Sequence, residues 1–475
     1  MGLNKVLKVT SDAELLSFMI NQDPILSREI DLPVQGQSIQ PIGELIMSNE
    51  RYKNAFLNTI NLVGLTVIDR NYWENPWENF ANKGQLRFGQ TVREMIVDIA
   101  NVYDYNKTAN DSENFLKNVV PNVYQYLHEI NYQKYYKTTT SDEQMAMAFA
   151  TEGGLFDLIE KIIGSLYEAY KYDKYIADKY QLCRRILNGT MTVHEIENYA
   201  TKTTREVVAE MKGVANKMSF RSPNYNPTGV RVANNFDDLI LIMNTDFEAS
   251  MSTDVLATSF FRNDAEFKTR MALIDGFSTH DTNRLQELLG SQYVPFTSTE
   301  LSELAKVPAV IVSVDFFQDY YYALNNDPAS STEAGLKKTD FFNPETLKRN
   351  HWLHIWAVIS TSPYAQSVVF TEDVTPAVNS VTVSPEKMSI SAGNSVKLSS
   401  VVATTGFANK GVTYSITQDP ETDPTKKATV DLNGKVTIPA GHMVTTPNKN
   451  TETIVVTATS VFDKTKKGTC TITVL

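Results

Sequence analysis

The chain has 475 residues, of which 42% are hydrophobic and 21% are charged, and its formal net charge at pH 7 is −11. These proportions are typical of a globular protein with roughly two to three domains, and they exclude a chain that is disordered throughout. Because proteins that bind nucleic acid through its phosphates are basic, the acidic balance argues against a sequence-specific DNA-binding protein.

Cys183 and Cys470 are the two cysteines of the chain, and they fall in different predicted domains. This excludes a disulfide framework and a zinc site built from cysteine ligands. Residues 1–6 are too polar for a secretory signal, and the aliphatic runs are far shorter than the ~20 residues of a membrane span. We therefore expect a protein that is neither exported nor inserted in a membrane.

The N-terminal region combines short helices with an irregular segment. Ser11 and Glu14 form a predicted capping box that begins a short helix. Residues 22–50 are rich in Pro, Gln and Ser without a clear period, so we interpret them as an extended arm that lies over other surfaces. A second helix is predicted for residues 48–63.

Strand-like residues 65–69 and 91–99 flank a segment with two tryptophans around an Asn-Pro pair. Proline excludes a helix interior, so the pattern predicts a protruding hairpin with a long aromatic loop. Trp73, Pro76 and Trp77 are the predicted inter-subunit contacts, because tryptophan is enriched where interfaces hold their binding energy. The alternative is that both rings pack under their own loop.

Residues 141–187 carry the strongest helical pattern of the chain. One apolar stripe at helical spacing consists of Leu155, Ile159, Ile162, Leu166 and Tyr170. Gly153 and Gly154 predict a break or kink near the start of this pattern, which leaves one helix of 30 or more residues.

From residue 192 to residue 370 the pattern alternates between helices and strands. Helices are predicted for residues 204–218 and 254–261. Strands are predicted for residues 238–243, 271–275, 309–314, 352–360 and 366–370. With the helices before it, this alternation predicts an α+β fold.

Residues 376–475 differ from the rest of the chain in composition. They hold three aromatic residues, Phe407, Tyr414 and Phe462, and their formal charge is +3, whereas the remainder carries −14. Short alternating runs recur at residues 378–383, 395–398, 412–416, 429–432, 435–438, 453–459 and 469–474. This pattern predicts a separate small β-sandwich after a linker at residues 371–376.

Motifs for catalysis, cofactor binding or metal binding do not stand out in this sequence. His351 and His354 have a metal-like spacing, but residues three apart in a strand point to opposite faces. Asp237 and Asp238 have no basic partner at a suggestive spacing, and Cys183 is interpreted as a buried structural thiol. We therefore predict no catalytic residue, no cofactor and no metal site.

Segments spread over nearly the whole chain follow one order: residues 60–68, 75–76, 83–85, 89–94, 98–99, 121–123, 128–129, 273–277, 354–356, 365–370 and 374–378. In this order they resemble the major capsid protein of phi29-like podoviruses. The resemblance implies a Hong-Kong-97-type capsid fold over residues 1–372. Its parts are an N-terminal arm (1–50), an extended loop region (65–105), a spine helix region (141–190), a mainly axial domain (191–343) and return strands (344–372). Residues 281–308 exceed the family pattern and predict an inserted surface loop.

A second set, residues 381–385, 393, 398, 412–415, 429–431, 433–436 and 455–459, resembles the group 2 bacterial Ig-like domain. Tyr414 stands where that family usually has Trp. The resemblance implies an Ig-like domain at residues 376–475. Such domains occur on adhesins and on phage structural proteins alike.

Together the resemblances imply a major capsid protein that self-assembles from pentamers and hexamers into an icosahedral or prolate shell. The shell would enclose double-stranded DNA without sequence-specific binding, with a scaffolding protein and a portal as partners and the Ig-like domain on its outside. We expect a virion protein, assembled in the bacterial host cytoplasm, that is not an enzyme. The alternatives are a bacterial surface adhesin and a cell-wall glycan hydrolase with an appended Ig-like module.

Overall fold

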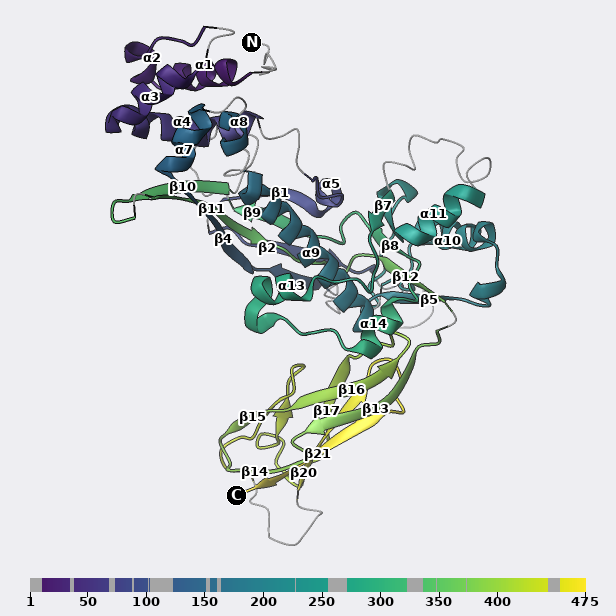
Figure 1. The fold of residues 1–475 in the computed structure, drawn as a ribbon. Coiled ribbons are helices and arrows are strands. Elements are labelled where there is room, and N and C mark those ends of the chain that lie inside the picture. Colours follow the sequence, from purple (N-terminus) through teal and green to yellow (C-terminus); the bar gives the residue numbers. More distant parts are fainter. Residues whose placement is uncertain are drawn as a thin grey trace.

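The computed structural model describes residues 11–34, 38–67, 73–87, 89–100, 102, 123–150, 154–159, 164–226, 228–254, 271–322, 336–346, 348–372, 374–442 and 453–475. Figure 1 shows a group of N-terminal helices at one end, a first sheet with the helix α9 in the centre, a second sheet beside it, and an all-β domain at the other end. The mixed α+β class is as expected from the sequence.

The N-terminal helices pack into a bundle rather than an extended arm. They are α1 (Asp12–Gln22), α2 (Leu26–Glu29), α3 (Gln40–Ser48) and α4 (Glu50–Val67), and two helices from later in the chain, α7 (Asp142–Ala150) and α8 (Gly154–Ile159), pack against them. The Ser11 hydroxyl accepts a hydrogen bond from the Glu14 N–H at 3.3 Å, which confirms the predicted start of α1. The irregular arm predicted for residues 22–50 is wrong at α2 and α3, where Leu26 and Ile46 are fully buried.

The first sheet has the strand order β1-β9-β11-β10, and β4 also pairs with β11. Its strands are β1 (Asn82–Leu86), β4 (Tyr132–Ser141), β9 (Asp319–Tyr322), β10 (Leu336–Asn343) and β11 (Lys348–Val358). Buried and partly exposed residues alternate along β11, so Leu353 and Ile355 lie in the core. The short helix α5 (Glu78–Ala81) leads directly into β1.

Helix α9 (Ser165–Leu187) is the longest of the described helices, with 23 residues, and it contacts β4. The predicted helical region contains α7, α8 and α9, and Gly154 of the double glycine is the first residue of α8. Two further helices, α13 (Thr282–Leu289) and α14 (Ser298–Leu304), pack against α9 with Leu285 and Leu304 buried. The surface loop predicted for residues 281–308 is therefore wrong.

The second sheet has the order β5-β12-β8-β6-β7. Its strands are β5 (Thr192–Ile196), β6 (Leu239–Asn244), β7 (Met271–Ile274), β8 (Ala309–Ser313) and β12 (Ser367–Glu372). Every residue of β8 is buried, as expected for a central strand. Helix α10 (Thr204–Met218) begins at a capping box between Thr203 and Glu206, and α11 (Thr245–Asp254) contacts it.

The division into an axial segment (191–343) and return strands (344–372) does not follow the sheets. Strand β12 lies in the predicted return segment but pairs with β5 and β8 of the second sheet. Strands β9 and β10 lie in the predicted axial segment but belong to the first sheet. Pairing across the two sheets depends on crossovers that local sequence patterns do not show.

A two-stranded hairpin is formed by β2 (Val92–Val97) and β3 (Val123–His128). The prediction of a strand at residues 91–99 is confirmed for β2. Its predicted partner at residues 65–69 is wrong where the structure describes it, because residues 65–67 continue helix α4. The remaining residues of that segment, and most of the loop between β2 and β3, lie outside the described residues.

The all-β domain begins at β13 and has its own hydrophobic core. Its strands are β13 (Ala377–Ser384), β14 (Lys387–Ile390), β15 (Ser395–Lys397), β16 (Ser399–Thr405), β17 (Val412–Gln418), β18 (Thr429–Val430), β19 (Lys435–Thr437), β20 (Ile454–Ser460) and β21 (Lys467–Val474). The small sheets β13-β16, β14-β21-β20-β17 and β15-β19-β18 share one apolar cluster. The alternating runs read from the sequence are thus strands of one domain.

Candidate inter-subunit contact sites

Trp77 lies inside the chain rather than on its surface. Its side chain is fully buried, with ring centroids 5.3 Å from Tyr175 of α9 and 5.6 Å from Phe317. The indole Nε1–H donates a hydrogen bond to the carbonyl oxygen of Leu273 at 3.1 Å. The prediction of an exposed contact is therefore wrong for Trp77. Asn75 Oδ1 accepts a hydrogen bond from the Trp77 N–H in a tight turn, and the ring that follows this turn faces inward.

Trp73 and Pro76 lie on the surface. The Trp73 side chain is 44% exposed and makes edge contacts with Tyr172 and Tyr175, at centroid distances of 6.3 and 5.5 Å. Together with Glu168 it lines an open hollow of about 370 Å³ on α9. Contact of Trp73 and Pro76 with a neighbouring subunit stays a prediction.

One face of the β2–β3 hairpin is exposed and carries four apolar side chains. Cross-strand partners in a sheet share a face, so the pair Val97 and Val123 lies on the same face as Met95 and Leu127, whose own partners are Gln125 and Arg93. These four side chains, which we call the hairpin face, are between 45% and 57% exposed. The sequence analysis missed this surface, although Met95 and Val97, two positions apart in a predicted strand, could have indicated it.

The base of the hairpin is held by a buried histidine. His128 Nδ1 lies 2.6 Å from the Ser360 hydroxyl, and His128 Nε2 lies 3.3 Å from Glu94 of the opposite strand. Ser362 donates a hydrogen bond to the same Glu94 carboxylate at 2.6 Å. This network ties the hairpin to the connection between β11 and β12.

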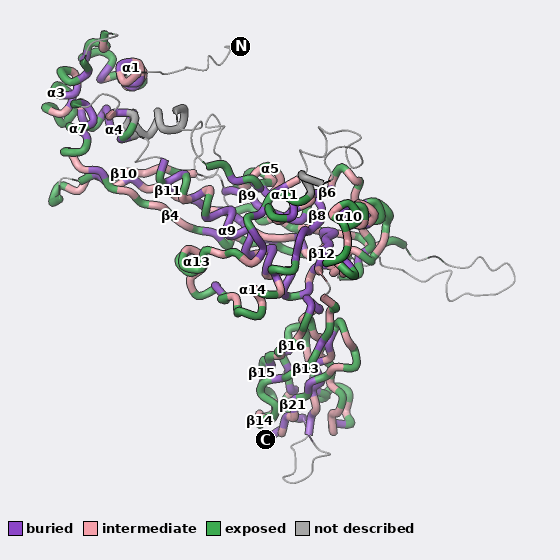
Figure 2. Tube along the Cα trace, turned by 45° about the vertical axis from the view of Figure 1, so that its right-hand side comes forward, coloured by how far each residue is buried: buried purple, intermediate pink, exposed green. Residues whose placement is uncertain are grey.

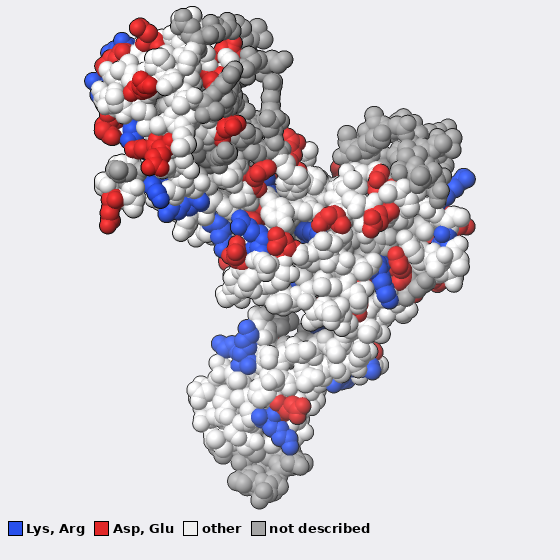
Figure 3. All heavy atoms as spheres, viewed as in Figure 1, with Lys and Arg blue, Asp and Glu red and all other residues white. Residues whose placement is uncertain are grey.

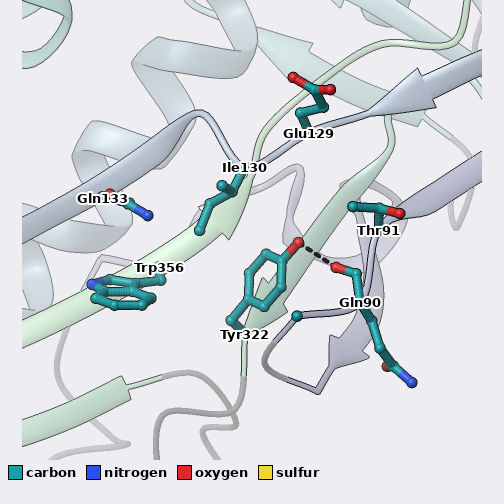
Figure 4. A pocket seen from close by; sticks show the side chains of 8 residues that line it. Gln90, Thr91, Glu129, Ile130, Gln133, Tyr322 and Trp356 are labelled. Atoms are coloured by element: carbon teal, nitrogen blue, oxygen red, sulfur yellow. Dashed lines mark hydrogen bonds between the residues drawn. The ribbon is translucent and has the colours of Figure 1, made fainter.

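An open pocket of about 470 Å³ lies where the hairpin joins the first sheet (Figure 4). Trp356, Tyr322 and Ile130 form its apolar walls, and the Tyr322 hydroxyl donates a hydrogen bond to the carbonyl oxygen of Gln90 at 2.6 Å. Because Gln90 precedes β2 and Ile130 follows β3, the pocket is continuous with the hairpin base. Its polar side chains converge on no recognisable reaction centre.

Three charged side chains lie buried between α9 and β9. Lys174 Nζ is 3.8 Å from Asp319 Oδ2 and 2.6 Å from the Glu78 carboxylate, and Asp178 lies one helical turn further along α9. Burial raises the pKa of Asp319 to about 7, and burial together with the Asp319 charge raises the pKa of Asp178 well above its usual value. These carboxyl groups can hold protons near neutral pH, but their burial leaves a substrate no access.

The histidine pair singled out from the sequence does not form a metal site. His351 is buried and its Nε2 lies 3.0 Å from the Thr140 hydroxyl, while His354 pairs with Thr339 at 2.9 Å. Burial lowers the pKa of His351 to about 4. Within the described ranges, no group of three or more His, Cys, Asp or Glu side chains could hold a metal ion.

Cys183 is a buried thiol, as interpreted from the sequence. Its Sγ lies 3.5 Å from the carbonyl oxygen of Phe277, and burial raises its pKa to about 12. A thiol in this environment is not a nucleophile.

Residues 31–371 match the family described as Phi29-like phage major capsid protein, which is well over half of the chain. The chain belongs to this family. The major capsid protein of Bacillus phage GA-1 is 27% identical over 408 residues, which cover 84% of this chain and 78% of that protein. The major capsid protein of Bacillus phage PZA is 28% identical over 385 residues, which cover 80% of this chain and 77% of that protein.

Two solved phage structures are also similar to this chain. A chain from the structure of the head fiber and inner core protein gp22 of native bacteriophage P68 has a TM-score of 0.48 at 15% identity, covering 64% of this chain and 86% of that chain. A chain from the capsid structure of Staphylococcus phage Andhra has a TM-score of 0.47 at 17% identity, covering 65% of this chain and 86% of that chain. Scores at this level add nothing to the assignment, which the family match carries.

As a member of this family, the chain is a major capsid protein of a tailed bacteriophage. The adhesin and glycan hydrolase alternatives are not favoured. Within the part of the chain that the structure describes, no helix combines the length and apolar character needed to cross a bilayer.

Proposed function

We propose that copies of this chain assemble through the hairpin face into a closed shell that encloses double-stranded DNA. The supporting observation is that four apolar side chains on one face of the hairpin, Met95, Val97, Val123 and Leu127, are left uncovered. Exposed apolar faces of this kind mark protein–protein contacts. In a shell of pentamers and hexamers each such contact is repeated by symmetry around the shell.

The parts of a Hong-Kong-97-type fold can be assigned to described elements. We assign the extended loop to the hairpin of β2 and β3. The sequence pattern placed this loop at residues 65–105, which include β2 but end before β3. The spine helix is α9, the peripheral part is the first sheet, and the axial part is the second sheet. The N-terminal helices α1 to α4 take the place of the arm.

The charge distribution supports a shell protein that encloses DNA without binding it tightly. On the face shown in Figure 3, basic side chains gather in a short band over the first sheet, with acidic side chains on both sides of it. The net charge of −11 disfavours tight phosphate binding. The role is structural rather than catalytic, the chain resides in the virion after assembly in the host cytoplasm, and a scaffolding protein and a portal are its further partners.

The C-terminal domain is proposed to be Ig-like and to lie on the outside of the shell. Its small sheets around one shared core fit a β-sandwich of Ig-like size. Packed DNA leaves little room for a further domain inside.

Electron microscopy and sedimentation of the purified full-length chain, alone and with its scaffolding protein, test the proposal. We expect shells, rings or sheets that contain many copies. A monomer in every condition, with the scaffolding protein included, would contradict the assembly proposal.

A further inference from the structure

The loop between β16 and β17 leaves the core of its own domain. Phe407 is 2% exposed and belongs to the main hydrophobic cluster, which includes Ile186 and Leu187 at the end of α9. The next residue, Ala408, is fully buried and belongs to the cluster of the all-β domain. Two adjacent residues therefore join the cores of two domains.

The backbone of this loop is held in an uncommon conformation. Gly406 and Phe407 have φ angles of +63° and +65°, in the left-handed region. A bulky residue such as phenylalanine rarely adopts this region unless the surrounding structure imposes it. The burial of the Phe407 ring in the other domain is the interaction that can impose it here.

The turn after α9 is shaped to receive the loop. Lys410 N–H donates a hydrogen bond to the carbonyl oxygen of Asn188 at 3.1 Å. Gly189 has a φ angle of +63°, and a Cβ at this position would collide with the backbone of Ala408 and Asn409. The two backbones thus pack against each other without an intervening side chain.

Charged and polar contacts add to this joint. Glu300 of α14 lies 3.3 Å from Arg184 and 3.9 Å from Lys410, so one carboxylate links α9 to the loop. In the linker, the Thr375 hydroxyl donates to Glu195 of β5 at 3.1 Å. Figures 1 and 2 show the all-β domain meeting the rest of the chain below α14 and β12.

We propose that the C-terminal domain is docked in one fixed orientation on the end of α9, with Phe407 as the anchor that completes the core of the capsid-fold part. The loop and the linker lie side by side at Gly406 and Thr375, but they contact different elements: the loop contacts the turn after α9, and the linker contacts β5. Together these contacts fix the direction of the domain as well as its position. Every copy of the chain presents the domain at the same angle. This inference does not depend on how the shell assembles.

Hydrogen exchange on the unassembled full-length chain tests the docking, because the Lys410 amide is bonded across the joint. Phe407→Asn removes the ring but keeps a residue that tolerates left-handed backbone. We expect the Lys410 amide to exchange on the order of tenfold faster, while the amides of β20 stay protected. Phe462→Ala, which truncates a 51% exposed ring of the same domain, is the matched control and should change neither. Unchanged protection of Lys410 in Phe407→Asn would overturn the proposal.

A second pair of variants decides the question if Phe407→Asn does not fold. Gly189→Ala and Gly229→Ala both place a Cβ on left-handed backbone, with φ angles of +63° and +75°. The Cβ at residue 229 meets nothing within 4 Å, whereas the one at residue 189 collides with the loop. Only Gly189→Ala should speed exchange at Lys410 and lengthen the particle in small-angle scattering. Equal behaviour of the two variants would show that the domains are not docked.

Discussion

Lys174 Nζ and Asp319 Oδ2 lie 3.8 Å apart, and both side chains are about 1% exposed. The same ammonium group donates a hydrogen bond to Glu78 at 2.6 Å, and the buried carboxyl of Asp178 lies nearby on α9. One cation therefore faces the partly exposed carboxylate of Glu78 and two aspartates, Asp178 and Asp319, that lie where water cannot stabilise their charge. Protonation of the aspartates relieves this imbalance.

Stability should fall as the pH rises from about 4 to about 7 because of this cluster. The pKa of Asp319 is about 7 in the folded chain and about 4 in an unfolded one, so the folded chain binds more protons in this window. Below the window both states are protonated, and above it the folded chain carries the full cost of a buried charge. Asp319→Asn mimics the protonated side chain and should flatten this dependence.

Thermal unfolding of the unassembled chain at pH 5.5, 7 and 8 measures the effect. The wild type should gain more in melting temperature on acidification than Asp319→Asn does. Parallel melting temperatures of the two proteins across this range would show that Asp319 does not titrate as inferred.

Removal of the cation should destabilise the chain most at alkaline pH. Lys174→Met leaves the two aspartates without their buried countercharge, and breaking such a pair costs about 3–5 kcal/mol. The loss should shrink at pH 5.5, because the aspartates are then protonated. Lys171→Met on the same helix, where the side chain is only partly buried, is the control in denaturant unfolding. An equal loss for both variants would contradict the countercharge role.

Truncation of Trp77 should lower the stability of the monomer, whereas truncation of Trp73 should weaken assembly. Trp77→Ala removes a fully buried ring and its hydrogen bond to Leu273, and it should cost about 3–5 kcal/mol of unfolding free energy. Trp73→Ala should leave the melting temperature of the monomer nearly unchanged and weaken assembly. Unfolding and shell yield measured on both variants separate these effects. Full assembly of Trp73→Ala would remove this residue from the predicted contacts.

The hairpin face should tolerate a charge in the monomer but not in the shell. Met95→Asp places a carboxylate on this exposed face, so folding should be unaffected, while assembly should lose about 2 kcal/mol or more per contact. Leu432→Asp in the all-β domain, at a residue that is 89% exposed, is the matched control. Light scattering measures the rate and extent of assembly. Identical assembly curves for the two variants would contradict the proposed contact.

Elements with a strong local period could be predicted from the sequence. The helix at residues 204–218 is α10, and its start is marked by Thr203 and Glu206, whose interaction is confined to one turn. The alternating runs after residue 376 are strands, and they too could be predicted because their period of two is local. Residues 22–50 contain helices α2 and α3, which are too short to show a period. They are stabilised by packing on other helices, α2 on α1 and α4, and α3 on α4 and α7.

The candidate sites depended on contacts between distant segments. The sequence by itself determined that Trp73 and Trp77 flank a turn, that β2 is a strand, and that the C-terminal hundred residues form an all-β unit. Only the tertiary structure decided that Trp77 points at Leu273 across nearly 200 residues, and that Phe407 leaves its own domain for the end of α9. Local patterns record which face of an element is apolar, whereas its partner is chosen by the packing of the whole chain.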